Sequence, residues 1–208
     1  HWYTQNPQIM KYLKLISLIC IATIGLLFTS CEETAVVDEY ANWQERNEEF
    51  IRDIAQKAKA NEDGKWKRIL SYRLDSLDNQ GNPIEHSFDD YIYCYIEHDS
   101  AGTTHPNYTD FVSVNYRGRL IPTESQPKGK VFDESYKGEF NPQHNVPRNF
   151  YVNELITGWS TALMHMTKGD IWRIYIPANL GYGAQNKTDI PAHSTLIFDL
   201  NLVDFSDK

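Results

Sequence analysis

The chain has 208 residues, a formal net charge of −8 and a hydrophobic content of 41%. This composition fits a globular protein with one main folded domain, and the acidic balance argues against a nucleic-acid-binding protein, which needs a basic surface to contact phosphates. Aromatic residues make up 13% of the chain and indicate a fold rich in β-structure.

The segment that begins at Met10 has the three parts of an export signal. Lys11 and Lys14 supply the positive charge, residues 15–28 form an apolar run, and small residues follow that run. A membrane-spanning helix is the alternative, but the run is shorter than the ~20 residues that a span needs. We therefore predict a signal segment here.

Cys31 follows the apolar run in the way that resembles the lipid-modified cysteine of bacterial lipoproteins. The likeness has one departure, because Phe28 stands where leucine is commoner, and a cysteine placed there by chance is the alternative. We predict that residues 1–30 are the signal segment, with residues 1–9 as an over-extension ahead of Met10, and that Cys31 is the lipidation site.

The three cysteines of the chain are Cys20, Cys31 and Cys94. Removal of the signal and lipidation of Cys31 would leave Cys94 alone, so we predict no internal disulfide, although an export compartment would permit one. Cys94 lies in a run that alternates like a strand, and we expect it to be a small buried hydrophobic residue.

The next segment is predicted to contain a helix over about residues 38–60. Its apolar residues Phe50, Ile54 and Ala58 recur at i, i+4 and i+8, and lysines gather towards its end. Such a stripe more often packs against the protein's own domain than against a partner. Residues 65–83 fit either a second helix or an irregular strand.

Short runs rich in Tyr, Val, Ile and Phe then predict strands, because apolar and polar residues alternate in them. These runs are residues 90–98, 111–120, 169–177 and 194–205. Since they are mostly connected without helices, we expect an antiparallel sheet.

One short helix is predicted among the strands, over residues 157–169. Trp159, Leu163 and Met166 share one of its faces, and Gly169 is expected to be its C-cap. The expected fold class is α+β: a curved antiparallel sheet, or half-barrel, wrapped around one short helix and preceded by an N-terminal helical segment.

Six strings occur in a fixed order: VNYRGRL, VFDESY, ELITGW, ALMHMTKGD, IPANLGYGA and IPAHSTLIFDLNLVDF. Together they resemble the FKBP family of peptidyl-prolyl cis-trans isomerases over roughly residues 90–206. With its N-terminus, the chain is similar to an exported bacterial FKBP lipoprotein. The predicted organisation is a signal over residues 1–30, a tether and N-terminal helical region over residues 31–89, and an isomerase domain over residues 90–208.

The reaction that this resemblance implies is a bond rotation, which a protein can accelerate without covalent chemistry. An X-Pro bond rotates over a barrier of ~18–20 kcal/mol, and no covalent bond is made or broken. We therefore expect no nucleophile, metal or cofactor to be required. A water-poor apolar cleft disfavours the polar planar amide, and a donor holds the substrate carbonyl. A thousandfold acceleration needs only ~4 kcal/mol.

The resemblance also assigns site residues. The catalytic candidates are Tyr116, Asp133 and Tyr182, and the substrate-binding candidates are Phe132, Phe150, Leu155, Ile156, Trp159, Ile190 and Phe198. It implies that the proline ring packs on Trp159, and that the Ile156 N–H and the Tyr182 hydroxyl bind substrate carbonyls. Asp133 would orient Tyr116 or polarise the site. Taken singly, each aromatic residue could be plain core, and Asp133 could be a turn residue.

The loops depart from the family pattern. The connections at residues 121–130 and 137–150 are long, and the loop at residues 183–190 is short. Arg148 or Asn149 stands near the usual place of a pocket aromatic. Since these loops would border the cleft, the resemblance leaves substrate preference and macrolide affinity open.

The predicted function is a peptidyl-prolyl cis-trans isomerase that assists the folding of exported proteins. Its expected partners are proline-containing polypeptide clients, macrolides as candidate ligands, and a membrane through the lipid anchor. The expected location is a bacterial cell envelope, on the periplasmic side of a membrane or at the cell surface. The seven histidines show no metal-like pair. The alternative function is an FKBP-fold chaperone or protein-binding module with little isomerase activity.

Overall fold

The computed structural model describes residues 38–206. The predicted signal segment, Cys20 and the predicted lipid site Cys31 lie outside these residues. Within the described part, no helix combines the length and apolar character that crossing a membrane requires. The helices are α2 (Trp43–Ala60) and α3 (Thr157–Leu163), with the short 3-10 turns η1 (Phe88–Asp90), η2 (Val152–Glu154) and η3 (Ala178–Leu180). The strands are β1 (Trp66–Leu70), β2 (Tyr91–His98), β3 (Phe111–Arg119), β4 (Val131–Glu134), β5 (Arg148–Tyr151), β6 (Ile171–Ile176) and β7 (Leu196–Ser206).

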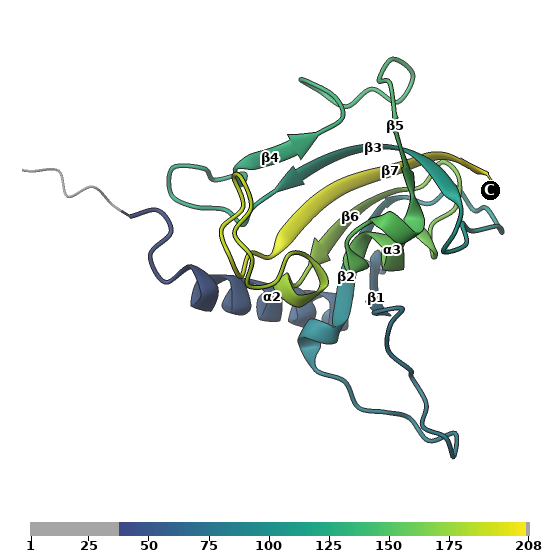
Figure 1. Ribbon diagram of the computed structural model, residues 1–208, viewed down its shortest axis with the longest axis horizontal. Helices are drawn as coiled ribbons and strands as arrows, with labels where there is room; N and C mark the ends of the chain where they lie inside the picture. The colour runs from purple at the N-terminus through teal and green to yellow at the C-terminus, as the bar shows by residue number, and fades with distance from the viewer. Residues whose placement is uncertain (1–37, 207–208) are drawn as a thin grey trace, which may run out of the picture. The chain divides into compact units, whose positions relative to one another are not determined.

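The strands form one antiparallel sheet in the order β1-β2-β6-β7-β3-β4, and β5 also pairs with β3 (Figure 1). The four predicted strands are confirmed as β2, β3, β6 and β7. The ambiguous segment after α2 is a strand at Trp66–Leu70, which pairs with β2. The α+β prediction, with a short helix against a curved antiparallel sheet, is therefore confirmed.

The inner face of the sheet packs on α3 and forms the main core. Alternate residues of β2 and β6, such as Ile92 and Ile174, are buried there with Leu163 of α3. Cys94 is a free, fully buried cysteine in this core, as predicted. The side chains between them on the strands point to the outer face, as the two-residue period of a strand requires.

The predicted length of the short helix is wrong, because α3 ends at Leu163. The Asp170 carboxylate accepts a hydrogen bond of 2.8 Å from the Thr167 N–H and so holds the following residues in a turn. Gly169 is not a helix cap. It has a φ of 97° in this turn, and its N–H donates to the Leu202 carbonyl at 2.7 Å.

The other helix, α2, packs against the outer face of the sheet. Its buried residues Ile51, Ile54 and Ala58 contact Tyr93 of β2. The stripe therefore packs against the protein's own sheet, as predicted. The helix begins at Trp43, later than predicted, after Asn42, whose φ of 51° is left-handed rather than helical.

Two polar contacts fix the start of α2 to the segment that leads into β7. The Trp43 Nε1 donates to the Ser194 Oγ at 2.8 Å, and the Asn47 Oδ1 accepts from the Thr195 N–H at 2.8 Å. Asn47 is buried and out of reach of water, so the hydrogen bond to Thr195 satisfies an amide oxygen that would otherwise have no partner. As a result, α2 is attached to the same segment of chain that follows the loop at residues 182–193.

Candidate active site

A cavity of about 560 Å³ opens between α3, strands β3, β4 and β7, and the loop after η3. All ten predicted catalytic and substrate-binding residues line it: Tyr116, Phe132, Asp133, Phe150, Leu155, Ile156, Trp159, Tyr182, Ile190 and Phe198. Three further lining residues, Glu154, Lys187 and Thr188, were not predicted. We call this cavity the cleft. The structure brings the predicted residues together, and their roles remain predictions.

Trp159 forms the base of the cleft. Its side chain is 4% exposed and yet lines the cavity. The rings of Tyr116, Phe150 and Phe198 approach the indole at centroid distances of 5.0, 6.0 and 5.1 Å, each nearly perpendicular to it. Edge-to-face contacts of this kind are favourable for aromatic pairs. The three rings therefore hold the indole in one orientation and surround it with apolar walls.

Two glycines allow close packing beneath and beside the cleft. A Cβ at Gly158 would lie 2.5 Å from the Ile176 Cγ2, so only glycine lets the first turn of α3 reach β6. A Cβ at Gly118 of β3 would lie 2.5 Å from Phe198 and 2.6 Å from Phe132. Both glycines are therefore needed for packing at the cleft.

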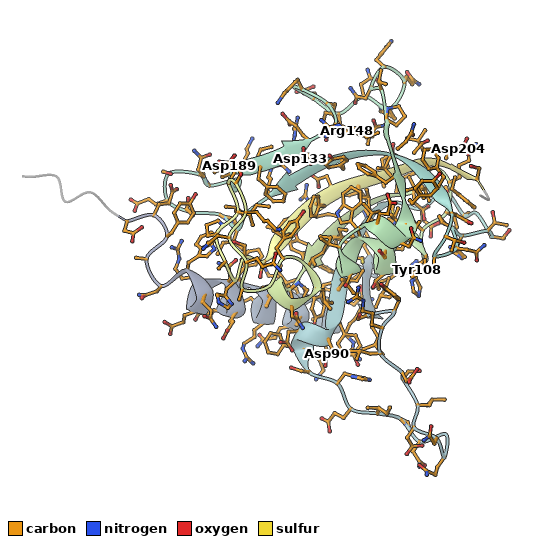
Figure 2. All side chains as sticks on the ribbon, viewed as in Figure 1. Asp90, Tyr108, Asp133, Arg148, Asp189 and Asp204 are labelled. Carbon is orange, nitrogen blue, oxygen red and sulfur yellow. The ribbon has the colours of Figure 1, made fainter. Side chains whose placement is uncertain are left out.

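A polar network borders the apolar walls. The Tyr116 hydroxyl donates to the Asp133 Oδ2 at 2.7 Å, and the Arg148 Nη1 donates to the same hydroxyl at 2.9 Å. Arg148 and Asp133 also form an ion pair of 3.4 Å, and Figure 2 shows both at the same edge of the sheet. Their side chains are both 51% exposed, whereas Tyr116 is 3% exposed. The network therefore lies at the boundary between the cleft and solvent.

The protonation state of Tyr116 follows from its surroundings. Burial raises the pKa of Tyr116 well above its ordinary value, and the hydrogen bond to Asp133 raises it further, while Arg148 acts in the opposite direction. The hydroxyl is therefore neutral at physiological pH and acts as a donor. A proton on Tyr116 and a negative charge on Asp133 suit orientation of the ring better than proton transfer.

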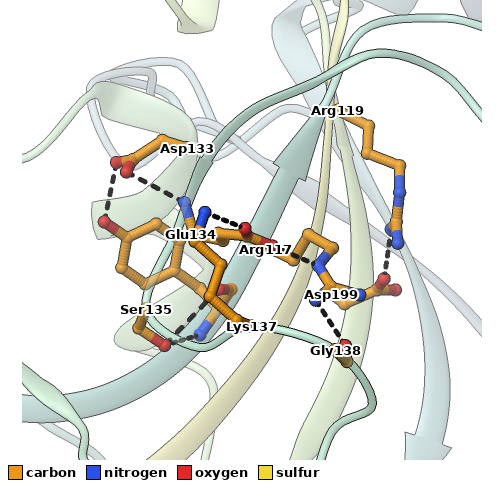
Figure 3. A network of polar contacts seen from close by, with 9 residues as sticks. Arg117, Arg119, Asp133, Glu134, Ser135, Lys137, Gly138 and Asp199 are labelled. Atoms are coloured by element: carbon orange, nitrogen blue, oxygen red, sulfur yellow. Dashed lines mark hydrogen bonds and ion pairs between the residues drawn. The ribbon is translucent and has the colours of Figure 1, made fainter.

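The chain directly after Asp133 is fixed by charged contacts (Figure 3). Arg117 pairs with Glu134 at 2.7 Å and also donates to the Gly138 carbonyl at 2.6 Å. Lys137 pairs with the same carboxylate. The bonds from Lys137 and Arg117 hold the pKa of Glu134 below its ordinary value. These contacts keep strand β4, and with it Asp133, in register with β3.

The unused hydrogen-bond donors of the cleft include the Trp159 Nε1 at its base and two groups at its walls. The Ile156 carbonyl accepts from the Trp159 and Ser160 N–H groups, but the Ile156 N–H has no partner among residues 38–206. The Tyr182 hydroxyl also has none within the described chain. Burial raises the pKa of Tyr182, and the charge of Asp133 adds to this, so that hydroxyl is a donor at neutral pH. Both groups are available to substrate carbonyls.

The loop that carries Ile190 closes one side of the cleft. Backbone hydrogen bonds of 2.9 and 3.1 Å join Lys187 and Ile190 across a tight turn, in which Asp189 has a left-handed φ of 66°. The Asp189 carboxylate accepts from the Lys130 Nζ at 2.8 Å. The two loops that depart from the family pattern are therefore in contact beside the cleft.

The cleft offers a bound group an apolar surface and hydrogen-bond donors. In the part of the chain that the structure describes, no three His, Cys, Asp or Glu side chains group together as a metal site. Cys94 is far from solvent, and burial raises the pKa of its thiol, so it is not a nucleophile.

Comparisons with known proteins agree with this geometry. Residues 102–203 match the family described as FKBP-type peptidyl-prolyl cis-trans isomerase. The peptidyl-prolyl cis-trans isomerase Mip of Coxiella burnetii is 40% identical over 104 residues, which make up 50% of this chain and 40% of that protein. FkpA of Escherichia coli is 39% identical over 100 residues, which make up 48% of this chain and 32% of that protein. The matched region is thus less than half of either relative.

Solved structures show the same fold. A peptidyl-prolyl cis-trans isomerase from Pseudomonas syringae pv. tomato is 26% identical, with a TM-score of 0.52 over 79% of this chain and 96% of that one. The crystal structure of FkpA from Escherichia coli is 22% identical, with a TM-score of 0.54 over 98% of this chain and 74% of that one, and it supports the fold alone. The sequence match, the fold and the cleft lead to one conclusion: residues 102–203 of this chain form a domain of the FKBP family of peptidyl-prolyl cis-trans isomerases.

Proposed function

We propose that the protein is a peptidyl-prolyl cis-trans isomerase that acts on proline-containing polypeptides. The observation that carries this proposal is a cleft with an aromatic base at Trp159 and two unused donors, the Ile156 N–H and the Tyr182 hydroxyl, at its walls. A proline ring is apolar and has no N–H, so an aromatic surface accommodates it without leaving a donor unsatisfied. The family match of residues 102–203 supports the same activity.

The cleft would accelerate rotation by favouring the twisted amide. Resonance makes the planar amide more polar than the twisted one, so removal from water raises the free energy of the planar state more. The Ile156 N–H and the Tyr182 hydroxyl would hold carbonyls next to the rotating bond, which fixes the substrate while the bond turns. Interactions that are stronger in the transition state than in the ground state are the ones that raise the rate.

The Tyr116–Asp133–Arg148 network is proposed to position the cleft rather than to transfer a proton. Asp133 keeps the Tyr116 ring perpendicular to Trp159 by accepting a hydrogen bond from the Tyr116 hydroxyl. Its negative charge at the edge of the cleft also favours the twisted amide, whose nitrogen is more basic. Removal of Asp133 is therefore expected to lower the rate without abolishing binding.

A protease-coupled assay on a short proline peptide tests this function. The wild-type protein is expected to accelerate isomerisation, and the Trp159→Leu variant to lose at least tenfold in kcat/KM. Trp66→Leu is the matched control, because Trp66 lies on β1 and stacks on Tyr175, away from the cleft. Circular dichroism checks that both variants are folded. Folded wild-type protein with no effect on the rate would replace this proposal with a binding or chaperone module.

We also propose that the protein is exported, is lipidated at Cys31, is attached to a membrane of the bacterial envelope, and assists the folding of exported clients. The sequence from Met10 to Cys31 supports this, and the proposed organisation divides the chain into residues 1–30, 31–89 and 90–208. A Cys31→Ser variant is expected to move from the membrane fraction to the soluble fraction. Macrolide binding is proposed from the family resemblance alone. It is tested by asking whether a macrolide inhibits isomerisation of the short proline peptide.

A further inference from the structure

A second concave surface lies on the outer face of the sheet, away from the cleft. It is a groove of about 330 Å³ between the C-terminal half of α2, strand β1 and the start of β2. The residues that matter here are Arg52, Lys59, Arg68, His86, Phe88 and Tyr91. We call it the α2 groove. None of its residues lines the cleft.

The guanidinium groups of the α2 groove are held on aromatic rings. The Arg52 Cζ lies 4.0 Å from the centre of the Phe88 ring, and the Arg68 Cζ lies 4.3 Å from that of Tyr91. Neither arginine, nor Lys59, makes a hydrogen bond or ion pair with residues 38–206. Stacking fixes the plane of a guanidinium and leaves its N–H donors free. The groove thus presents two guanidinium groups whose orientation is fixed and whose N–H donors are unused.

Nearby acidic groups do not neutralise these cations. Asp90 lies 3.7 Å from the His86 Nδ1 and accepts the Ser87 N–H at 2.9 Å, so its carboxylate is already engaged. Asp89 lines the adjoining cavity along the N-terminal half of α2, and the α2 groove itself is lined by three cations and by no Asp or Glu. The α2 groove therefore has a local excess of positive charge in a chain whose formal net charge is −8.

The chemistry of the groove suits a carboxylate. Arginine forks bind carboxylates with two parallel hydrogen bonds, and a planar partner fits between aromatic walls. A membrane surface fits less well, because the groove is concave and a bilayer surface is broad and flat. We propose that the α2 groove is a binding site for acidic segments of polypeptides, and that these belong to the clients whose proline occupies the cleft.

The cleft and the groove are linked by one loop. Tyr182 lines the cleft, whereas the next residue, Gly183, lines the cavity along the N-terminal half of α2. That cavity also includes Arg52 and Phe88 and so continues into the α2 groove. An extended polypeptide that leaves the cleft past this loop would run along α2. The proposal that one client occupies both the cleft and the α2 groove rests on the proposed isomerase function. The affinity of the groove for an acidic peptide does not rest on it.

The test measures binding of a fluorescent ten-residue peptide of Glu, Gly and Ser, without proline, to the full chain by anisotropy. The groove variant is Arg52→Glu with Arg68→Glu. The matched control is Lys57→Glu with Lys67→Glu, which changes one exposed cation on each of the same two elements by the same charge, outside the groove. We expect binding to weaken at least tenfold in the groove variant only, and to weaken with added salt in the wild type.

Several results would overturn the inference. These are absence of binding to the wild-type protein, equal weakening in both double variants, or binding of phosphatidylserine vesicles through Arg52 and Arg68 while the peptide does not bind. If circular dichroism shows that the charge-reversed variant does not fold, Arg52→Gln with Arg68→Gln replaces it. This variant is also expected to bind the acidic peptide more weakly than the wild type.

Isomerase assays separate this inference from the proposed function. Turnover of a short proline peptide is expected to be the same in the wild type, the groove variant and the control. A longer peptide with an acidic segment beside the proline should show a higher KM, with kcat unchanged, in the groove variant alone. No turnover of the short peptide by protein that binds the acidic peptide would refute the isomerase proposal and leave the groove. Turnover without acidic-peptide binding would refute the groove alone.

Discussion

The Ile156 N–H can be removed without changing the local backbone. Ile156 has φ −59° and ψ 149°, and Leu155 before it has φ −95° and ψ 165°. Proline requires a φ near −65° and an extended residue before it, so Ile156→Pro fits both positions. Because this N–H has no partner within the described residues, its loss breaks no hydrogen bond of the fold. The folded protein should therefore remain stable.

The loss should instead appear in catalysis. A substrate carbonyl that enters the cleft without its donor loses about 1–3 kcal/mol, which lowers kcat/KM roughly 5- to 150-fold. The measurement is the rate of isomerisation of a short proline peptide, with Ile156→Val as the control that keeps the N–H and trims the side chain. Urea unfolding verifies that both variants are equally folded.

The reasoning would be refuted if Ile156→Pro and Ile156→Val had kcat/KM values within twofold of each other while both were folded. It would also fail if Ile156→Pro were strongly destabilised, because the N–H would then have a partner within the fold. A selective loss in the proline variant alone supports the role of this backbone donor.

Three further predictions follow from the same structure. Tyr182→Phe should leave the urea midpoint unchanged but lower kcat/KM about fivefold or more, because the hydroxyl is unused in the free protein. Gly158→Ala should lower the free energy of unfolding in urea, because a clash with the branched Ile176 side chain of about 1–3 kcal/mol outweighs the ~1 kcal/mol that alanine gains in a helix. The free energy of unfolding should stay constant up to about pH 10 and then fall towards pH 12. Burial raises the pKa of Tyr93 from 10.0 to about 12, so this tyrosine loses its proton at a lower pH in the unfolded chain than in the folded one. A free energy of unfolding that does not change through this range would contradict the raised pKa of Tyr93.

The long strands could be predicted because their residues alternate. In β3, for example, Val112 and Val114 are fully buried while Ser113 between them is partly exposed. Strands β4 and β5 have four residues each, which is too short for a period of two to be distinguished from chance. The turn after α3 could not be predicted either, because it is held by a carboxylate, Asp170, that lies beyond the apolar pattern of the helix.

The cleft was predictable for a different reason. Its lining residues are spread from Tyr116 to Phe198, and no periodicity links them. The family strings placed them together, and the structure does the same. Arg148 was missed as a partner of Asp133, because it follows a long connection whose path the sequence does not reveal. The contacts of α2 with Ser194 and Thr195 were missed for the same reason, since they join residues about 150 positions apart.

The central claim is that the cleft above Trp159 turns the bond before a proline. NMR exchange spectroscopy on a short peptide with an apolar residue before proline tests this most directly, because the peptide shows separate cis and trans signals that interconvert slowly on their own. With a small amount of the folded protein, exchange cross-peaks between the two sets are expected, and they should weaken strongly in Trp159→Leu. Folded wild-type protein that gives no cross-peaks would contradict the account.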